Sequence, residues 1–172
     1  LARIDVSAGS VGGYMAQSLA DRQPWRSQTG IGGKGAFEVA PNVADGFEHS
    51  AAASSWKFLH DGSGATIFLV HSRASSGGDY MLSTGNGQAT LHGISIKRYG
   101  TNCRVEVSNG TGVLANQVDV AGFTAAAHII EVGISTAGGV DILLDGGAAT
   151  TAAAGAFSSS NPTFTLNVGR RP

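Results

Sequence analysis

The residues that invite a chemical interpretation lie in the stretch WKFLHDGSGATIFLVHS, which runs from Trp56 to Ser72. His60, Asp61 and Ser63 are the residue types of a nucleophilic triad. Adjacent residues of a strand point to opposite faces, however, and a nucleophile elbow needs a helix after its turn. The run ATIFLV that follows the glycines has the composition of a strand. We therefore interpret WKFLH and ATIFLVHS as two strands of a hairpin, and Asp61 to Gly64 as the turn between them.

Paired carboxylates on one strand face would indicate a glycosidase, because a nucleophile and an acid must flank the same sugar. The nearest match to the spacing E-x-D-x-x-E is Asp45-Gly46-Phe47-Glu48, but Val43 stands two residues before Asp45. Glu131 has Gly133 where the aspartate would be needed. We therefore assign no catalytic residue and predict a protein that is not an enzyme. A divergent glucanase would require two carboxylates about 5–9 Å apart in a concave cleft.

Signatures of metals and cofactors are weak. The five histidines show neither H-x-x-x-H nor H-x-H spacing: His49, His60, His71, His92 and His128. Zinc is therefore not predicted, and no cofactor or metal ligand is assigned. Calcium bound by loop oxygens stays open, because Asp61, Asp79 and Asp145 lie at expected strand ends, although a role in turns is favoured for all three. Gly30 to Gly35 matches G-x-G-x-x-G by letter but lacks the preceding strand and following helix.

A sugar-binding site needs an aromatic ring for the apolar face of the sugar and polar groups for its hydroxyls. The candidates in or beside expected loops are Trp25, Asp79, Tyr80 and Tyr99. Trp56 is expected to pack beneath a sheet. Aromatic residues make up only 7% of the chain, so the sequence does not indicate a groove rich in aromatic rings.

Composition limits the partners of this chain of 172 residues, which is long enough for one domain with a sizeable core. Only 13% of residues are charged and the formal net charge is −1, so electrostatics favours neither nucleic acid nor an acidic membrane. No apolar run is long enough to span a membrane. The one cysteine, Cys103, excludes an internal disulfide and is interpreted as a buried strand residue.

The elements that must position these residues are short strands separated by glycine-rich turns. The expected strands after the first hairpin are DYMLST, TLHGISIKRY, CRVEVS, VLANQVDV, HIIEVGIS, VDILLD and FTLNV. Val105 and Val107 alternate with Arg104 and Glu106, as in a strand with one buried face. Likewise, Ile130, Val132 and Ile134 should face opposite to Ile129, Glu131 and Gly133.

Three further local patterns complete the expected secondary structure. The run TIFLV is apolar throughout, which predicts a central strand covered on both faces, with residues 67–70 almost wholly buried. Asn109-Gly110 predicts a hairpin turn, and Tyr14 to Ala20 at most one turn of helix. About nine or ten short strands at this spacing predict an all-β fold, a two-sheet antiparallel jelly roll.

Three segments in this order resemble the concanavalin A-like lectin/glucanase superfamily in its laminin-G-like form: QSLADRQPWRSQTGIGGKGAFEVAPNVADGF, WKFLHDGSGATIFLVHS and HIIEVGISTAGGVDILLDGGAAT…FTLNVGRR. The resemblance covers roughly residues 17 to 171. It implies a jelly-roll sandwich, as found in bacteriophage virion proteins and secreted bacterial adhesins, where the fold binds or assembles and does not catalyse.

We therefore expect one jelly-roll domain over residues 1–172, with 1–20 as an N-terminal arm or edge strand and 21–172 as the sandwich. The expected function is that of a non-enzymatic virion-surface structural protein, a capsid decoration or fibre module, with glycan adhesion as an added role. The alternative is a carbohydrate-binding module of a secreted bacterial protein. Expected partners are other virion subunits, including copies of the chain itself, and a cell-surface glycan, but neither nucleic acid nor membrane.

From the two ends of the sequence, we expect that it is part of a longer chain or of a larger assembly. FTLNVGRRP stops at Pro172, where similar domains continue into a further strand, and the chain opens with Leu1. Unpaired strand edges invite pairing. We therefore expect ARIDVS, at residues 2–7, or a neighbouring subunit to supply the missing strand.

Overall fold

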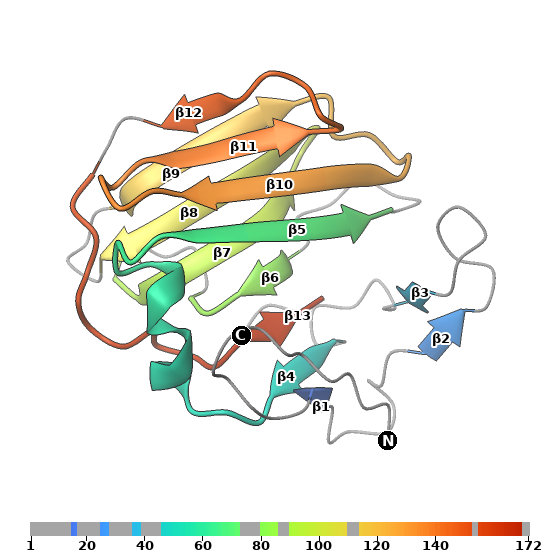
Figure 1. Cartoon of the computed structure of the whole chain (residues 1–172). Coiled ribbons are helices and arrows are strands. Elements are labelled where there is room, and N and C mark those ends of the chain that lie inside the picture. Colours follow the sequence, from blue (N-terminus) through green and yellow to red (C-terminus); the bar gives the residue numbers. More distant parts are fainter. Residues whose placement is uncertain are drawn as a thin grey trace.

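The protein is a two-sheet antiparallel jelly-roll sandwich (Figure 1). The computed structural model describes residues 15–16, 25–27, 36–38, 46–72, 80–85, 90–109, 114–152 and 155–169. The seven-stranded sheet has the order β1 (Met15–Ala16), β4 (Phe47–His49), β13 (Asn167–Val168), β6 (Tyr80–Ser83), β7 (His92–Tyr99), β8 (Asn102–Asn109) and β9 (Leu114–Ala121). The four-stranded sheet has the order β12 (Thr150–Ala152), β11 (Val140–Leu144), β10 (His128–Ile134) and β5 (Ala65–His71). β2 (Trp25–Ser27) pairs with β3 (Ala36–Glu38) in a separate two-stranded sheet.

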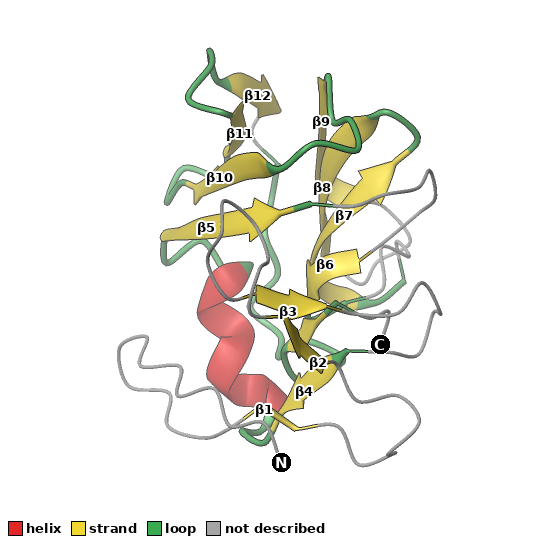
Figure 2. Ribbon diagram, turned by 90° about the vertical axis from the view of Figure 1, so that its right-hand side faces the viewer, coloured by secondary structure: helices red, strands yellow, loops and turns green. Residues whose placement is uncertain are grey.

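The core lies between the two large sheets, which Figure 2 shows side by side. Alternate residues of each strand point inward, so that Ile130 and Val132 of β10 and Val105 and Val107 of β8 are all fully buried. This confirms the alternation expected for β8 and β10. Cys103 is likewise buried in β8, as expected. No helix within the described residues is long and apolar enough to cross a membrane.

The position of β5 differs from the expectation. The sequence predicted a central strand, but β5 forms an edge of the four-stranded sheet. Phe68 and Val70 are 66% and 61% exposed, whereas Ile67 and Leu69 pack partly against the core. The prediction of near-complete burial was wrong because an uninterrupted apolar run does not reveal whether a second layer covers its other face.

The segment before β5 also differs from the expectation. WKFLH is not a strand but part of a 3-10 helix, η3 (Ala53–Leu59), so the hairpin interpretation was wrong in its first arm. The turn itself is confirmed, since Asp61 Oδ1 accepts a hydrogen bond of 2.9 Å from the Ser63 N–H. Gly62 has a φ of +84°, which glycine adopts without strain. His60 follows the last residue of the helix, and its Nε2 donates a hydrogen bond of 3.1 Å to the Ser160 carbonyl. His60 therefore has a structural role.

The C-terminal strand already has two partners. Asn167 of β13 is paired with Glu48 of β4 on one side and with Ser83 of β6 on the other. The expectation that this strand lacks a neighbour was therefore wrong, and the segment ARIDVS that was to supply one lies outside the described residues.

The remaining expectations near the N-terminus and the hairpin turn have mixed outcomes. Within the expected helical turn at Tyr14 to Ala20, Met15–Ala16 forms strand β1. β8 and β9 pair as the hairpin that Asn109-Gly110 predicted, but residues 110–113 lie outside the described part, so the turn type stays a prediction. The boundary between residues 20 and 21 stays a prediction as well, because neither is described.

Candidate binding surface

Two of the four predicted site residues lie on one face of the seven-stranded sheet. Tyr80 begins β6 opposite Lys97 of β7, and Tyr99 lies two residues further along β7. Because residues two apart share a face, the tyrosines are diagonal neighbours on the outer face, away from the core. Trp25 begins β2, with a side chain outside the described part, and Asp79 is not among the described residues.

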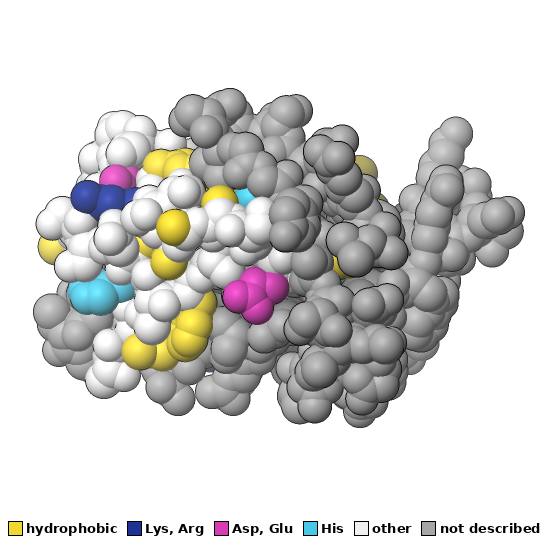
Figure 3. Space-filling model, turned by 90° about the horizontal axis from the view of Figure 1, so that it is seen from below, with side chains coloured by type: hydrophobic (Ala, Val, Ile, Leu, Met, Phe, Trp, Pro, Cys, Tyr) yellow, Lys and Arg dark blue, Asp and Glu magenta, His cyan; other side chains and the backbone are white. Residues whose placement is uncertain are grey.

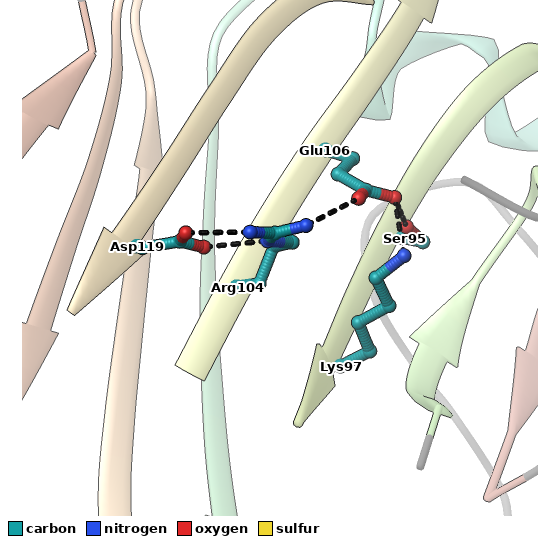
Figure 4. A network of polar contacts seen from close by, with 5 residues as sticks. All are labelled: Ser95, Lys97, Arg104, Glu106 and Asp119. Carbon is teal, nitrogen blue, oxygen red and sulfur yellow. Dashed lines mark hydrogen bonds and ion pairs between the residues drawn. The ribbon is translucent and has the colours of Figure 1, made fainter. Parts of the chain in front are cut away.

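Strand register also gathers four charged side chains and one serine beside the tyrosines, here called the charged network. Its members are Ser95, Lys97, Arg104, Glu106 and Asp119 (Figure 4). Arg104 donates from Nε and Nη2 to the two carboxylate oxygens of Asp119, at 2.6 and 2.7 Å. On the other side of Arg104, Glu106 lies 3.6 Å from the guanidinium and accepts from Lys97 Nζ at 2.7 Å and from Ser95 Oγ at 3.2 Å.

The tyrosines contact the cations of this network. The guanidinium carbon of Arg104 lies 3.8 Å from the centre of the Tyr99 ring, and Lys97 Nζ lies 5.4 Å from the centre of the Tyr80 ring. The hydrogen bonds to Asp119 raise the pKa of Arg104. The two cations are balanced by two carboxylates, so the network has no net charge. Tyr99 is 54% exposed and offers a ring on which an uncharged ligand could stack.

The central part of the outer face is closed to solvent. Register aligns Asn167, Ser83, Ser95 and Glu106 in one row across four strands. Each of these four residues is at most 3% exposed. Of the predicted aromatic candidates, Tyr99 remains accessible to a ligand at one end of this face, near Asp119, whose side chain is 29% exposed.

The charged network does not supply the carboxylate pair of a glycosidase. Glu106 and Asp119 both contact Arg104, which lies between them where a sugar would have to lie (Figure 4). Glu48 is exposed on the same face, and Asp45 is outside the described residues. The alternation in the sequence predicted that Arg104 and Glu106 share one strand face, but no sequence pattern assigned Lys97, Arg104, Glu106 or Asp119 to a site. The register of three strands was needed to join them.

A second polar cluster resembles a triad in its connections only. His128 Nδ1 donates to Asp145 Oδ2 at 2.7 Å, and its Nε2 lies 3.1 Å from Thr124 Oγ1. The backbone N–H of Thr124 already donates to the same Nε2 at 3.0 Å, so that lone pair is not free to accept the hydroxyl proton. The cluster therefore ties the loop before β10 to the turn after β11. Asp145 and Asp61 both act as turn residues, as expected.

Among the described residues, no group of three or more His, Cys, Asp or Glu side chains is placed so that it could hold a metal ion. Burial raises the pKa of the Cys103 thiol to about 12. The thiolate that metals bind therefore hardly forms at neutral pH.

A different surface lies on the outer face of the four-stranded sheet. Phe68 and Val70 of β5 and Ile129 of β10, here called the apolar stripe, are 66%, 61% and 56% exposed. Val70 and Ile129 are direct cross-strand partners, so their side chains adjoin. The sequence did not indicate this surface, because its uninterrupted apolar run predicted that residues 67–70 are buried.

Of the comparisons with known proteins, the one with solved structures alone found a similarity. No family model matches the chain, and no curated protein matches it. Among solved structures, the mouse laminin alpha1 chain, domains LG4-5, is similar over 63% of this chain and 28% of that chain, with 16% sequence identity and a TM-score of 0.48.

Proposed function

We propose that this chain is a non-catalytic structural module that joins neighbouring subunits of a larger surface assembly. The proposed setting is the surface of a virion, as a capsid decoration or fibre module. The observation that carries the proposal is the apolar stripe, because soluble monomers rarely expose large apolar side chains side by side. Covering Phe68, Val70 and Ile129 with a neighbouring subunit would remove this apolar area from water.

The weak charge of the chain supports the same proposal. With 13% charged residues and a net charge of −1, copies of the protein repel one another little. The underside of the molecule shows few charged side chains among the described residues (Figure 3). The position of Arg104 between two carboxylates and the occupied Nε2 of His128 argue against hydrolysis at either cluster.

Light scattering across a range of concentrations tests the role in assembly. The intact chain should associate, the double variant Phe68→Ser/Val70→Thr should lose association, and the control Tyr99→Ser should retain it, because Tyr99 is exposed on the other sheet. An intact chain that stays at 17.3 kDa at every concentration would contradict the proposal.

The non-catalytic character has its own test. The chain should not turn over β-glucans, alginate or peptidoglycan. Turnover that Glu48→Gln or Asp45→Asn abolishes would show an enzyme, since these are the acidic residues nearest to a glucanase spacing.

A second function, as the carbohydrate-binding module of a secreted bacterial protein or as an adhesive role of the virion module, is favoured by Tyr99 and the charged network. An exposed ring beside Asp119 suits a neutral glycan, because the network has no net charge to attract an acidic one. Titration calorimetry with neutral oligosaccharides should give binding that Tyr99→Ala abolishes and Phe68→Ser leaves unchanged. Binding only to sulfated glycans, weakened by salt, would oppose this assignment.

A further inference from the structure

One edge of β5, which no described strand covers, differs from β9 and β12 at other ends of the two large sheets. β5 has seven residues, and none of them is an acidic residue, lysine, arginine or proline. β9, at one end of the seven-stranded sheet, carries Asp119 in an ion pair, while β12 has only three residues. Proteins usually protect exposed edges with charges, prolines or short strands, and β5 has none of these protections.

The direction of the backbone groups of β5 follows from β10. The N–H of Ile129 donates to Asp145 Oδ1 and its carbonyl accepts from the Asp145 N–H, so both groups point away from β5. In an antiparallel strand such directions alternate, so His128, Ile130 and Val132 point their groups toward β5. Their partners there are His71, Leu69 and Ile67.

The remaining residues of β5 must then present their backbone groups to the free edge. These are Thr66, Phe68 and Val70, and no described strand pairs with that edge. The same three side chains are exposed on the outer face. The apolar stripe and the open hydrogen-bonding edge are thus formed by the same residues.

We propose that the edge binds a second copy of this chain, with the two β5 strands antiparallel and the two-fold axis at Phe68. The proposal rests on the assembly role proposed above and specifies its partner. The result would be one continuous eight-stranded sheet built from the two four-stranded sheets.

The register supports a second copy as the occupant. With Phe68 opposite Phe68 of the other copy, Thr66 lies opposite Val70, and Val70 opposite Thr66. Thr66, Phe68 and Val70 all point their backbone groups to this edge, so each pair exchanges two hydrogen bonds. Every edge-facing N–H and C=O within the paired segment then has a partner. On the outer face, each Phe68 contacts its equivalent, and each Val70 lies between Ile129 of its own chain and Thr66 of the other.

Charge does not oppose the pairing. Glu131, the cross-strand partner of Phe68, lies one strand behind the new contact. The two Glu131 residues of a dimer would be three strand spacings apart, roughly 14 Å. That separation exceeds the screening length of about 8 Å at physiological salt, so their repulsion is largely screened.

Hydrogen exchange combined with mass measurement tests the pairing in the full chain. At high concentration the mass should be twice 17.3 kDa, and the amides of Thr66, Phe68 and Val70 should become protected; on dilution both effects should disappear together. Val70→Lys should weaken the dimer and raise its Kd at least tenfold. Thr151 is exposed on β12 at the other end of the same sheet, so Thr151→Lys should leave the Kd unchanged.

A cysteine at the axis tests the register. Phe68→Cys in a Cys103→Ala background should oxidise rapidly to a covalent dimer, because opposed Cα atoms of a hydrogen-bonded pair lie about 5.5 Å apart, within disulfide range. Thr151→Cys should not. This result does not depend on the stability of the Val70→Lys variant.

The alternative outcomes separate this inference from the assembly role. Association with unprotected amides at Thr66, Phe68 and Val70 would overturn the edge pairing but leave a role in assembly intact. Protected amides in a monomer would show that another segment of the same chain covers the edge, and would overturn the pairing. A monomer with fast exchange at all concentrations would overturn both proposals.

Discussion

His128 and Asp145 are joined across the two ends of a β-hairpin, with Nδ1 of the imidazole 2.7 Å from Oδ2 of the carboxylate. The other oxygen of Asp145 accepts the N–H of Ile129 at 2.8 Å. Asp145 adopts a φ of +54°, which is uncommon for a residue other than glycine, so these two hydrogen bonds help to hold the turn after β11.

The His128–Asp145 pair predicts a dependence of stability on acid. The hydrogen bonds from His128 and from the Ile129 N–H lower the pKa of Asp145 below its ordinary value of 3.8. A carboxyl with a lowered pKa in the folded state stabilises the fold above its unfolded pKa, and this stabilisation is lost as the pH falls through the folded pKa. In urea titrations, the free energy of unfolding should fall less steeply below about pH 4 for Asp145→Asn than for the wild type. Equal slopes for Asp145→Asn and wild type would contradict the assignment.

Truncation to alanine should lower the free energy of unfolding far more at Ile130 than at Phe68. Ile130 is fully buried between the sheets, so Ile130→Ala should lower the free energy of unfolding by roughly 2–5 kcal/mol. Phe68 is 66% exposed, and Phe68→Ala measured on the dilute protein should cost less than about 1 kcal/mol. Comparable losses in a denaturant titration would mean that β5 is covered on both faces after all.

The charged network should make Glu106 costly to replace. Its side chain is 4% exposed and accepts from Lys97, whose side chain is 13% exposed, so removing the carboxylate leaves a largely buried cation without this partner. Glu106→Ala should cost roughly 3 kcal/mol. Adding Lys97→Met should recover part of that loss in a double-mutant cycle. Glu131→Ala, which removes a carboxylate from β10 of the other sheet, serves as control and should change stability by no more than about 0.5 kcal/mol.

Gly93 should not tolerate a side chain. Its φ is +130°, and a Cβ there would lie 2.7 Å from the backbone N of Gly85 and from the backbone carbonyl atoms of Thr84. Gly93→Ala should therefore destabilise the fold by on the order of 3 kcal/mol. Gly100→Ala, with a φ of +63° and open space around the added carbon, should cost only about 1 kcal/mol. Thermal unfolding of both variants would check the difference, and equal shifts in Tm would show that the approach of β7 to Gly85 can relax.

Cys103 should resist alkylation in the folded protein. Burial raises the pKa of its thiol to about 12, so almost no thiolate forms at pH 8. Iodoacetamide should label the residue only after unfolding, as followed by mass spectrometry. Rapid labelling of the native chain at low denaturant would show that β8 opens locally.

The sequence by itself determined the alternation of buried and exposed residues. Val105, Val107, Ile130 and Val132 point inward as their spacing predicts, because side chains two apart in a strand share a face. It also determined the turn at Asp61, whose carboxylate caps a nearby N–H, and the all-β class that follows from many short strands. These features depend on neighbours within a few residues, so local pattern is enough to predict them.

Tertiary structure alone decided which strands are neighbours. The apolar run of β5 is compatible with a central strand or an edge, and only the sheet order places Phe68 and Val70 at an exposed edge. The candidate binding surface also depended in part on tertiary structure. Tyr80 and Tyr99 were candidates from the sequence, but only the register of β6, β7 and β8 brings them close to Lys97 and Arg104. Register and sheet order arise from contacts between distant segments, and a pattern that repeats every two residues is the same in each arrangement.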